Sequence, residues 1–214
     1  MKRILTGALF LLLLVAIILL GVWNYHLNAL YQQGFEDALL NWERGARQLF
    51  ALQEALDDCM DGYDKASVAE AIMRTNLCDW EWLQLSQYCI NGPGQAYRNS
   101  EKEVEYHGRT AVTAGNGYIE SDLRFLLERI RMRLDDDRYA VVREPEGEMA
   151  YDDFVSQAKQ EIDLICETIH SAGEPDADTP DRLYRQYIVT MAEIKEIVAQ
   201  SSLLQTEEAS TRNE

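Results

Sequence analysis

The chain has 214 residues, of which 47% are hydrophobic and only four are proline, so its composition is that of a folded protein. Its 37 acidic residues outnumber its 20 Lys and Arg residues and give a formal net charge of −17. This charge argues against binding to nucleic acid, which requires a basic surface, and against peripheral binding to anionic lipid.

The first predicted element is a membrane-spanning helix. Residues 4–23 consist almost entirely of Leu, Ile, Val, Ala and Phe, and they carry no charge. Twenty helical residues extend about 30 Å, which is the thickness of the hydrocarbon core of a bilayer. The run ends at a tryptophan, a residue type that is enriched where a helix leaves the bilayer. The anchor is represented below by Ile4, Leu12, Ile18 and Trp23.

The charges on either side of the run predict its orientation. Lys2 and Arg3 precede it, whereas Glu36 and Asp37 are the first acidic residues after it. The positive-inside rule then places residues 1–3 in the cytoplasm and residues 24–204 in the periplasm, followed by a polar tail at 205–214. The alternative is a cleaved signal peptide, but the run exceeds the usual ~7–15 residues and lacks an A-x-A site. We therefore expect a retained single-pass anchor in the cell inner membrane.

The same helix is predicted to continue to residue 60 as a stalk. Its apolar and small residues recur at alternating spacings of three and four, which is typical of a helix that packs along one seam. Small residues in the seam would let another helix approach closely, and Trp42 is a candidate anchor for that contact. The seam is either one face of an intramolecular bundle or the contact surface of a parallel homodimer. The apolar surface of the helix is wider than a strict heptad seam, which favours the bundle. The central seam residues are Phe35, Ala38, Trp42, Gly45 and Leu49.

Further helices are predicted after this stalk. Asp61-Gly62 ends the first helix, and Ser67-x-x-Glu70 predicts a capping box for a second helix that kinks near Asn76. The sequence Asn91-Gly92-Pro93-Gly94 then breaks the chain.

The segment from 95 to 117 is the hardest to interpret. It reads either as a helix over 100–107 followed by a turn at Gly115-Asn116-Gly117, or as a short β-hairpin around that turn.

Clear helical patterns return in the last third of the chain. A helix is predicted from Ile119 to Leu134, and a second runs from Tyr151 to a C-cap at Gly173. Thr179 is predicted to cap a last helix that begins with Pro180. Together these elements predict an all-α fold, with about five helices in one extracytoplasmic bundle.

Four cysteines would lie in an oxidising compartment, and their even number permits two disulfides. Cys78 and Cys89 flank a predicted helix and would be about 16 Å apart, too far for a bridge. The remaining pairings are 59–78 with 89–166 and 59–89 with 78–166. We expect at least one disulfide among Cys59, Cys78, Cys89 and Cys166, the alternative being four buried free thiols.

The motifs that could bind a metal are incomplete. Asp57-x-Cys59-x-Asp61-Gly62 has the spacing of an EF-hand loop, but the twelfth position is Val68, where calcium requires Glu. Glu167-x-x-His170 occurs once, whereas a di-iron bundle site needs this motif twice. No catalytic motif is recognisable. We therefore expect no enzyme activity, no catalytic residue, no cofactor and no metal.

Two further features could form an interface. A basic cluster could bind a carboxylate or phosphate, although internal salt bridges are the favoured interpretation. Trp80 and Trp82 cannot share one helix face because they are two residues apart, so one of them could be an exposed anchor. The basic cluster consists of Arg124, Arg129, Arg131, Arg133 and Arg138.

The function that these features favour is association. We expect a structural or accessory subunit that tethers other envelope proteins, with the membrane and envelope proteins or a second copy as partners. The alternatives are a periplasmic ligand-binding helical module and a bacteriophage-type lysis or exclusion effector.

Overall fold

The structure is a computed structural model that describes residues 2–92, 103–112, 120–141, 149–201 and 203–204. These residues form six main helices and one two-stranded sheet, so the prediction of a mostly helical chain is confirmed. The chain divides into two compact units, Met1–Asp37 and Ala38–Glu214, which are described separately below.

The first helix, α1, extends from Lys2 to Met60 without a break. Its end lies immediately before Asp61-Gly62, as the sequence predicted, and Gly62 has a positive φ of 118°. The first unit is the apolar part of this helix, and the remaining turns of α1 belong to the second unit.

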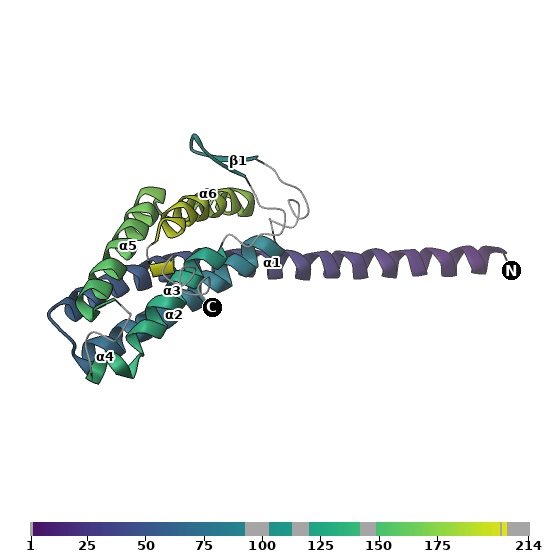
Figure 1. The fold of residues 1–214 in the computed structure, drawn as a ribbon. Coiled ribbons are helices and arrows are strands. Elements are labelled where there is room, and N and C mark those ends of the chain that lie inside the picture. Colours follow the sequence, from purple (N-terminus) through teal and green to yellow (C-terminus); the bar gives the residue numbers. More distant parts are fainter. Residues whose placement is uncertain (1, 93–102, 113–119, 142–148, 202, 205–214) are drawn as a thin grey trace, which may run out of the picture. The chain divides into compact units, whose positions relative to one another are not determined.

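The second unit is built from helices that pack in pairs. Helices α2 (Lys65–Asn91) and α3 (Glu120–Leu134) lie side by side, and α5 (Tyr151–Ala172) lies next to α6 (Pro180–Ala199) (Figure 1). The last turns of α1 contact α2 through an edge-on Trp42–Trp82 ring pair, and contact α5 through a hydrogen bond from Gln53 to Asp163. The largest fully buried side chains are Trp42, Trp82, Tyr139, Tyr151, Tyr187 and Phe154.

Helix α2 begins three residues before the predicted capping box. Asp64 is the N-cap, and its Oδ2 accepts hydrogen bonds from the backbone N–H groups of Ser67 (2.9 Å) and Ala66 (3.1 Å). Glu70 does not reach back to a cap but accepts a hydrogen bond from Arg74 Nε at 2.7 Å. The predicted box was therefore wrong. Helix α2 continues without interruption through Asn76, where a kink was predicted.

The ends of α5 and α6 agree with the sequence. Gly173 follows α5 with a φ of 78°, a conformation that glycine adopts without strain. Thr179 Oγ1 accepts a hydrogen bond from the backbone N–H of Arg182 at 3.3 Å, and Pro180 is the first residue of α6. Proline suits that position because its missing N–H would have no helical partner there.

A β-hairpin replaces the helix predicted over 100–107. Strands β1 (Glu103–Tyr106) and β2 (Arg109–Val112) pair in antiparallel register, with Tyr106 opposite Arg109. His107 and Gly108 both have positive φ values, which is typical of a two-residue type I′ turn. Val104 and Tyr106 are buried while their neighbours are exposed, because one face of the hairpin packs on α6. The turn predicted at Gly115–Gly117 lies outside the described residues.

A short helix, α4 (Asp137–Val141), follows α3 and was not predicted. Asp136 starts it by accepting a hydrogen bond from the backbone N–H of Arg138 at 3.0 Å. The helix carries Tyr139, which stacks on Phe154 and packs edge-on against Tyr151. Tyr139 thereby fixes the start of α5 against the end of α3.

Candidate functional site

The apolar end of α1 has the properties of a membrane span. Within the described residues it belongs to the one helix that is long and apolar enough to cross a bilayer, with a mean hydropathy of 1.7. None of the apolar window is buried, which distinguishes it from the core helix of a soluble protein. Of the predicted anchor residues, Ile18 and Trp23 are exposed, whereas the side chains of Ile4 and Leu12 lie outside the described part of the chain.

The predicted interaction seam is filled from within the second unit. Ala38, Trp42, Gly45 and Leu49 are all buried there, and α2 covers the middle of the stripe with the ring of Trp82. The structure therefore places an intramolecular contact where the sequence also allowed a homodimer. A partner helix that used this face would have to displace α2. Phe35 belongs to the first unit.

The four cysteines are free thiols, and all four are buried. The structure therefore contains no disulfide among them. It contains the alternative that the sequence also allowed, four buried free thiols. Burial raises the pKa of Cys78 far above its ordinary range, and the neighbouring Cys166 raises it further. Burial also raises the pKa of Cys166 to about 12, with the charge of Asp163 acting in the same direction. Thiols with such pKa values remain protonated and react slowly.

The sequence motifs considered for metals do not form sites. In the described part of the chain, no group of three or more His, Cys, Asp or Glu residues is arranged to hold a metal ion. Asp64 from the EF-hand-like segment caps α2 instead. Glu167 and His170 are both exposed on α5.

The basic cluster lies on α3 and α4, where internal partners neutralise much of its charge. Arg124 Nε donates to Asp79 Oδ1 at 2.6 Å, and Arg138 pairs with Asp136 at 2.6 Å. Arg133 donates to the hydroxyl of Tyr139 at 3.1 Å. Exposed ion pairs of this kind contribute about 0–1 kcal/mol each to stability. Of these three contacts, the Arg124–Asp79 pair joins α3 to α2, and the other two are local to α3 and α4.

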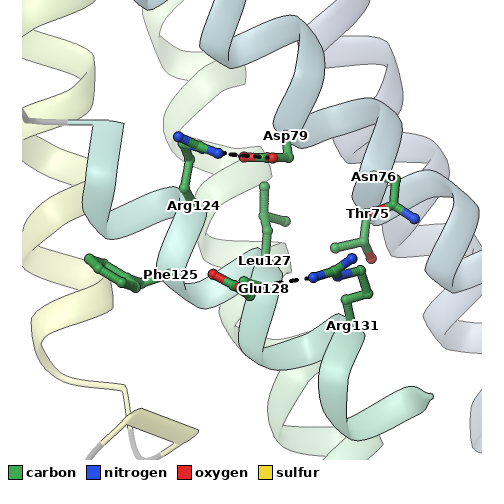
Figure 2. Close-up of a pocket in the computed structure, with 8 residues that line it drawn as sticks. All are labelled: Thr75, Asn76, Asp79, Arg124, Phe125, Leu127, Glu128 and Arg131. Carbon is green, nitrogen blue, oxygen red and sulfur yellow. Dashed lines mark hydrogen bonds and ion pairs between the residues drawn. The ribbon is translucent and has the colours of Figure 1, made fainter.

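A groove of about 270 Å³ lies between α2 and α3 beside this cluster (Figure 2). The Arg124–Asp79 pair stands at one end of the groove, and Arg131 approaches Glu128 at 3.7 Å toward the other end. Its surface therefore consists of paired charges, and it offers an anion little unpaired positive charge.

The exposed side of α2 carries an apolar stripe. Met73, Leu77 and Trp80 are spaced by four and three residues, which places them on one helix face, and 58% of Trp80 is exposed. Trp82 is fully buried, so the two tryptophans lie on different faces, as the sequence predicted. We call Met73, Leu77 and Trp80 the α2 stripe.

The hairpin is tied to the C-terminal helices by polar contacts. Arg109 Nη1 donates to both carboxylate oxygens of Glu193 on α6, to Oε2 at 2.9 Å and to Oε1 at 3.2 Å. Tyr106 donates its hydroxyl to Asp176 Oδ2 at 3.1 Å, and Arg182 Nε donates to the same oxygen at 2.9 Å. Burial raises the pKa of Tyr106 to about 12, and its hydrogen bond to Asp176 contributes in the same direction.

A second groove, between α5 and α6, contains a residue that the sequence analysis did not single out. Glu161 lines this groove and is 4% exposed. Its position could have been inferred, because it lies three residues after Ala158 and four before Ile165, both on the buried face of α5. A carboxylate within an apolar helix face is the signal that was missed.

Comparison of the chain with protein-family models, curated proteins and solved structures returns no match. Three structural features bear on the function. They are an apolar N-terminal part of α1 with no buried residues in its apolar window, an apolar stripe on α2, and a groove that contains a buried carboxylate.

Proposed function

We propose that the chain is a single-pass membrane protein that acts as a structural or interaction subunit of an envelope complex. The observation that carries this proposal is the exposure of the apolar side chains over residues 13–31 of α1. An apolar helix exposed on every side is unfavourable in water, and a bilayer is the environment that covers it completely. The charge asymmetry across residues 2–37 supports an orientation with the N-terminus in the cytoplasm and residues 24–204 in the periplasm.

The α2 stripe supports association as the function of the folded part. Three large apolar side chains on one helix face form a surface that excludes water when a partner covers it, and exposed Trp is enriched among interface anchors. The chain carries a net charge of −17, so two copies would bring like charges together. We therefore assign the stripe to a different envelope protein with a less acidic surface.

The anchor is tested on the protein isolated from membranes. Intact-mass spectrometry should give the mass of the uncleaved chain, and the protein should stay in the membrane pellet after alkaline carbonate extraction. A mature N-terminus close to Leu30 would show a cleaved signal peptide and would contradict the membrane-anchored function.

The interaction surface is tested with tagged full-length protein solubilised in mild detergent. We expect one partner to co-purify in constant ratio with the wild type and with the control Val141→Ser, whose exposed valine lies on α4. Leu77→Ser/Trp80→Ser should lose this partner while the helical circular dichroism and melting temperature are retained. Equal recovery with both variants would contradict the assignment of the α2 stripe, and recovery of a second copy alone would replace the assigned partner with a homodimer.

A further inference from the structure

The groove between α5 and α6 is open and has a volume of about 420 Å³, which is within the range of small-ligand sites. Its described lining includes three carboxylates, from Glu161, Glu193 and Glu196, and no Lys, Arg or His. Glu193 is paired with Arg109 at 2.9 Å. The charge of the groove is therefore negative even after this pair is discounted.

Two polar atoms in this groove are buried without a partner. Glu161 is 4% exposed, and while its Oε1 accepts a hydrogen bond from Gln157 at 2.9 Å, its Oε2 has no hydrogen-bond partner among the described residues. The hydroxyl of Ser201, a residue that is 2% exposed, also has none among them. Both residues line the same groove.

The lack of partners for Glu161 Oε2 and Ser201 Oγ is unusual for a folded protein. Buried polar atoms in folded proteins almost always have a partner, and leaving a charged one unpaired is strongly unfavourable. Because both unpaired atoms belong to residues that line one groove, we infer that a group outside the described protein atoms completes their hydrogen bonds. An ionised carboxylate oxygen only accepts hydrogen bonds, so this group must be a donor, and the negative charge of the groove favours a cation.

The lining also restricts the kind of cation. Within the described residues no carboxylate set is arranged to hold a metal ion, which favours an organic cation. Leu164 and Ile197 line the groove beside the carboxylates and provide an apolar surface for an alkyl stem. A primary ammonium group has three donors, enough for Glu161 Oε2, Ser201 Oγ and a further acceptor such as Glu196.

We propose that the groove between α5 and α6 binds a primary alkylammonium ligand, with its ammonium group on Glu161 Oε2 and Ser201 Oγ. Leu164 and Ile197 contact the alkyl stem. This site lies on helices other than the one that carries the α2 stripe, and the inference does not depend on the proposed function. It would give the folded part a ligand-dependent stability.

The test uses full-length protein in detergent at constant ionic strength, with 1,4-diaminobutane and n-butylamine as probes and n-butanol as the uncharged control. We expect both amines to raise the melting temperature and to bind saturably in isothermal titration calorimetry, whereas n-butanol should do neither. Absence of saturable amine binding to the wild type would overturn the proposal.

Variants locate the binding. Glu161→Gln should weaken amine binding by at least about tenfold, because a charge-assisted hydrogen bond is lost. Ser201→Ala should weaken it by a smaller factor and provides a second test if Glu161→Gln fails to fold. The matched control is Glu167→Gln, which removes an exposed carboxylate on the same helix outside the groove.

Two outcomes would contradict the inference. If Glu161→Gln and Glu167→Gln weaken binding equally, the amines bind to the general negative charge of the surface. If Mg²⁺ or Ca²⁺ stabilises the wild type more than the amines do, and Glu161→Gln abolishes that effect, the groove is a metal site instead.

Discussion

A methyl group placed on Gly45 would lie 2.9 Å from the Cε2 and Nε1 atoms of Trp82. Trp82 is fully buried and packs edge-on against Trp42, with ring centroids 5.6 Å apart. The indole therefore rests directly on the backbone of α1, and it has little room to move. Gly45 is required by close packing between two helices of the same chain.

Gly45→Ala should destabilise the folded part by about 1–3 kcal/mol, because the added methyl group forces the buried indole to shift. The change would otherwise stabilise a helix by about 1 kcal/mol, so the packing cost must exceed this gain. Urea unfolding followed by circular dichroism measures the difference. Gly21→Ala is the control, because nothing lies within 4 Å of its Cβ position, and it should not lower the stability. An increase in stability with Gly45→Ala would contradict the close packing.

The thiols should be unreactive in the folded protein. Burial raises the pKa of Cys59, Cys78 and Cys166, so few thiolates form near neutral pH. A maleimide reagent should leave the native protein unmodified, and it should add four labels in denaturant without any reductant. Fewer than four labels in unreduced, denatured protein would reveal a disulfide and would contradict the structure.

The folded protein should lose stability in acid because the Asp176 carboxylate becomes protonated. Burial acts to raise its pKa, but hydrogen bonds from the Asp178 backbone, Tyr106 and Arg182 outweigh burial and hold the pKa below its ordinary value. A carboxyl whose pKa is lower in the folded than in the unfolded state stabilises the fold above the unfolded pKa of about 3.9. This contribution disappears as the pH falls through the folded pKa, below about pH 4.

Asp176→Asn should therefore reduce stability at pH 7 by about 1–3 kcal/mol and flatten the dependence of stability on pH below about pH 4. Unfolding curves recorded between pH 2 and pH 7 measure both effects. Asp58→Asn, an exposed site on α1, should keep the acid dependence of the wild type. An unchanged slope in Asp176→Asn would show that this carboxyl does not govern the acid response.

Gln186 should be intolerant of apolar replacement. Its buried amide accepts from the Asp176 backbone N–H at 2.7 Å and donates to the carbonyl oxygens of Ala172 and Glu174, both at 2.9 Å. Gln186→Met preserves the size of the side chain but leaves these backbone groups without partners, which should cost about 2 kcal/mol or more. Thermal unfolding measures the loss, and the exposed Gln87→Met serves as its control. Hydrogen exchange should also accelerate at Asp176.

The helices were predictable where their signals were local. Thr179, Pro180 and Gly173 act within one helical turn of their own positions, and each has the predicted role. The start of α2 was less predictable, because Asp64 and Ser67 are both good caps. Which of the two residues becomes the N-cap depends on where the helix first packs against the core. That packing involves residues distant in the sequence and is not visible in the local pattern.

The hairpin and the groove depend on contacts between distant segments. Strands of four residues are too short to display a reliable period, and the burial of Val104 and Tyr106 is decided by α6, far along the chain. The groove likewise needs Ser201 to meet the face of α5 that carries Glu161. The expectation of a disulfide came from the compartment rather than from geometry, and compartment alone does not bring two sulfur atoms together.

The four reduced cysteines have a practical consequence for making the protein. Because no covalent bridge is part of the fold, refolding requires neither a thiol oxidase nor a disulfide isomerase, and dithiothreitol in the buffer does not oppose it. The folded part can thus reach the same structure in a reducing or in an oxidising compartment. In a reducing host, the yield of folded protein will depend on whether the apolar segment of α1 is inserted into a membrane or detergent. It will not depend on the redox potential of the cell.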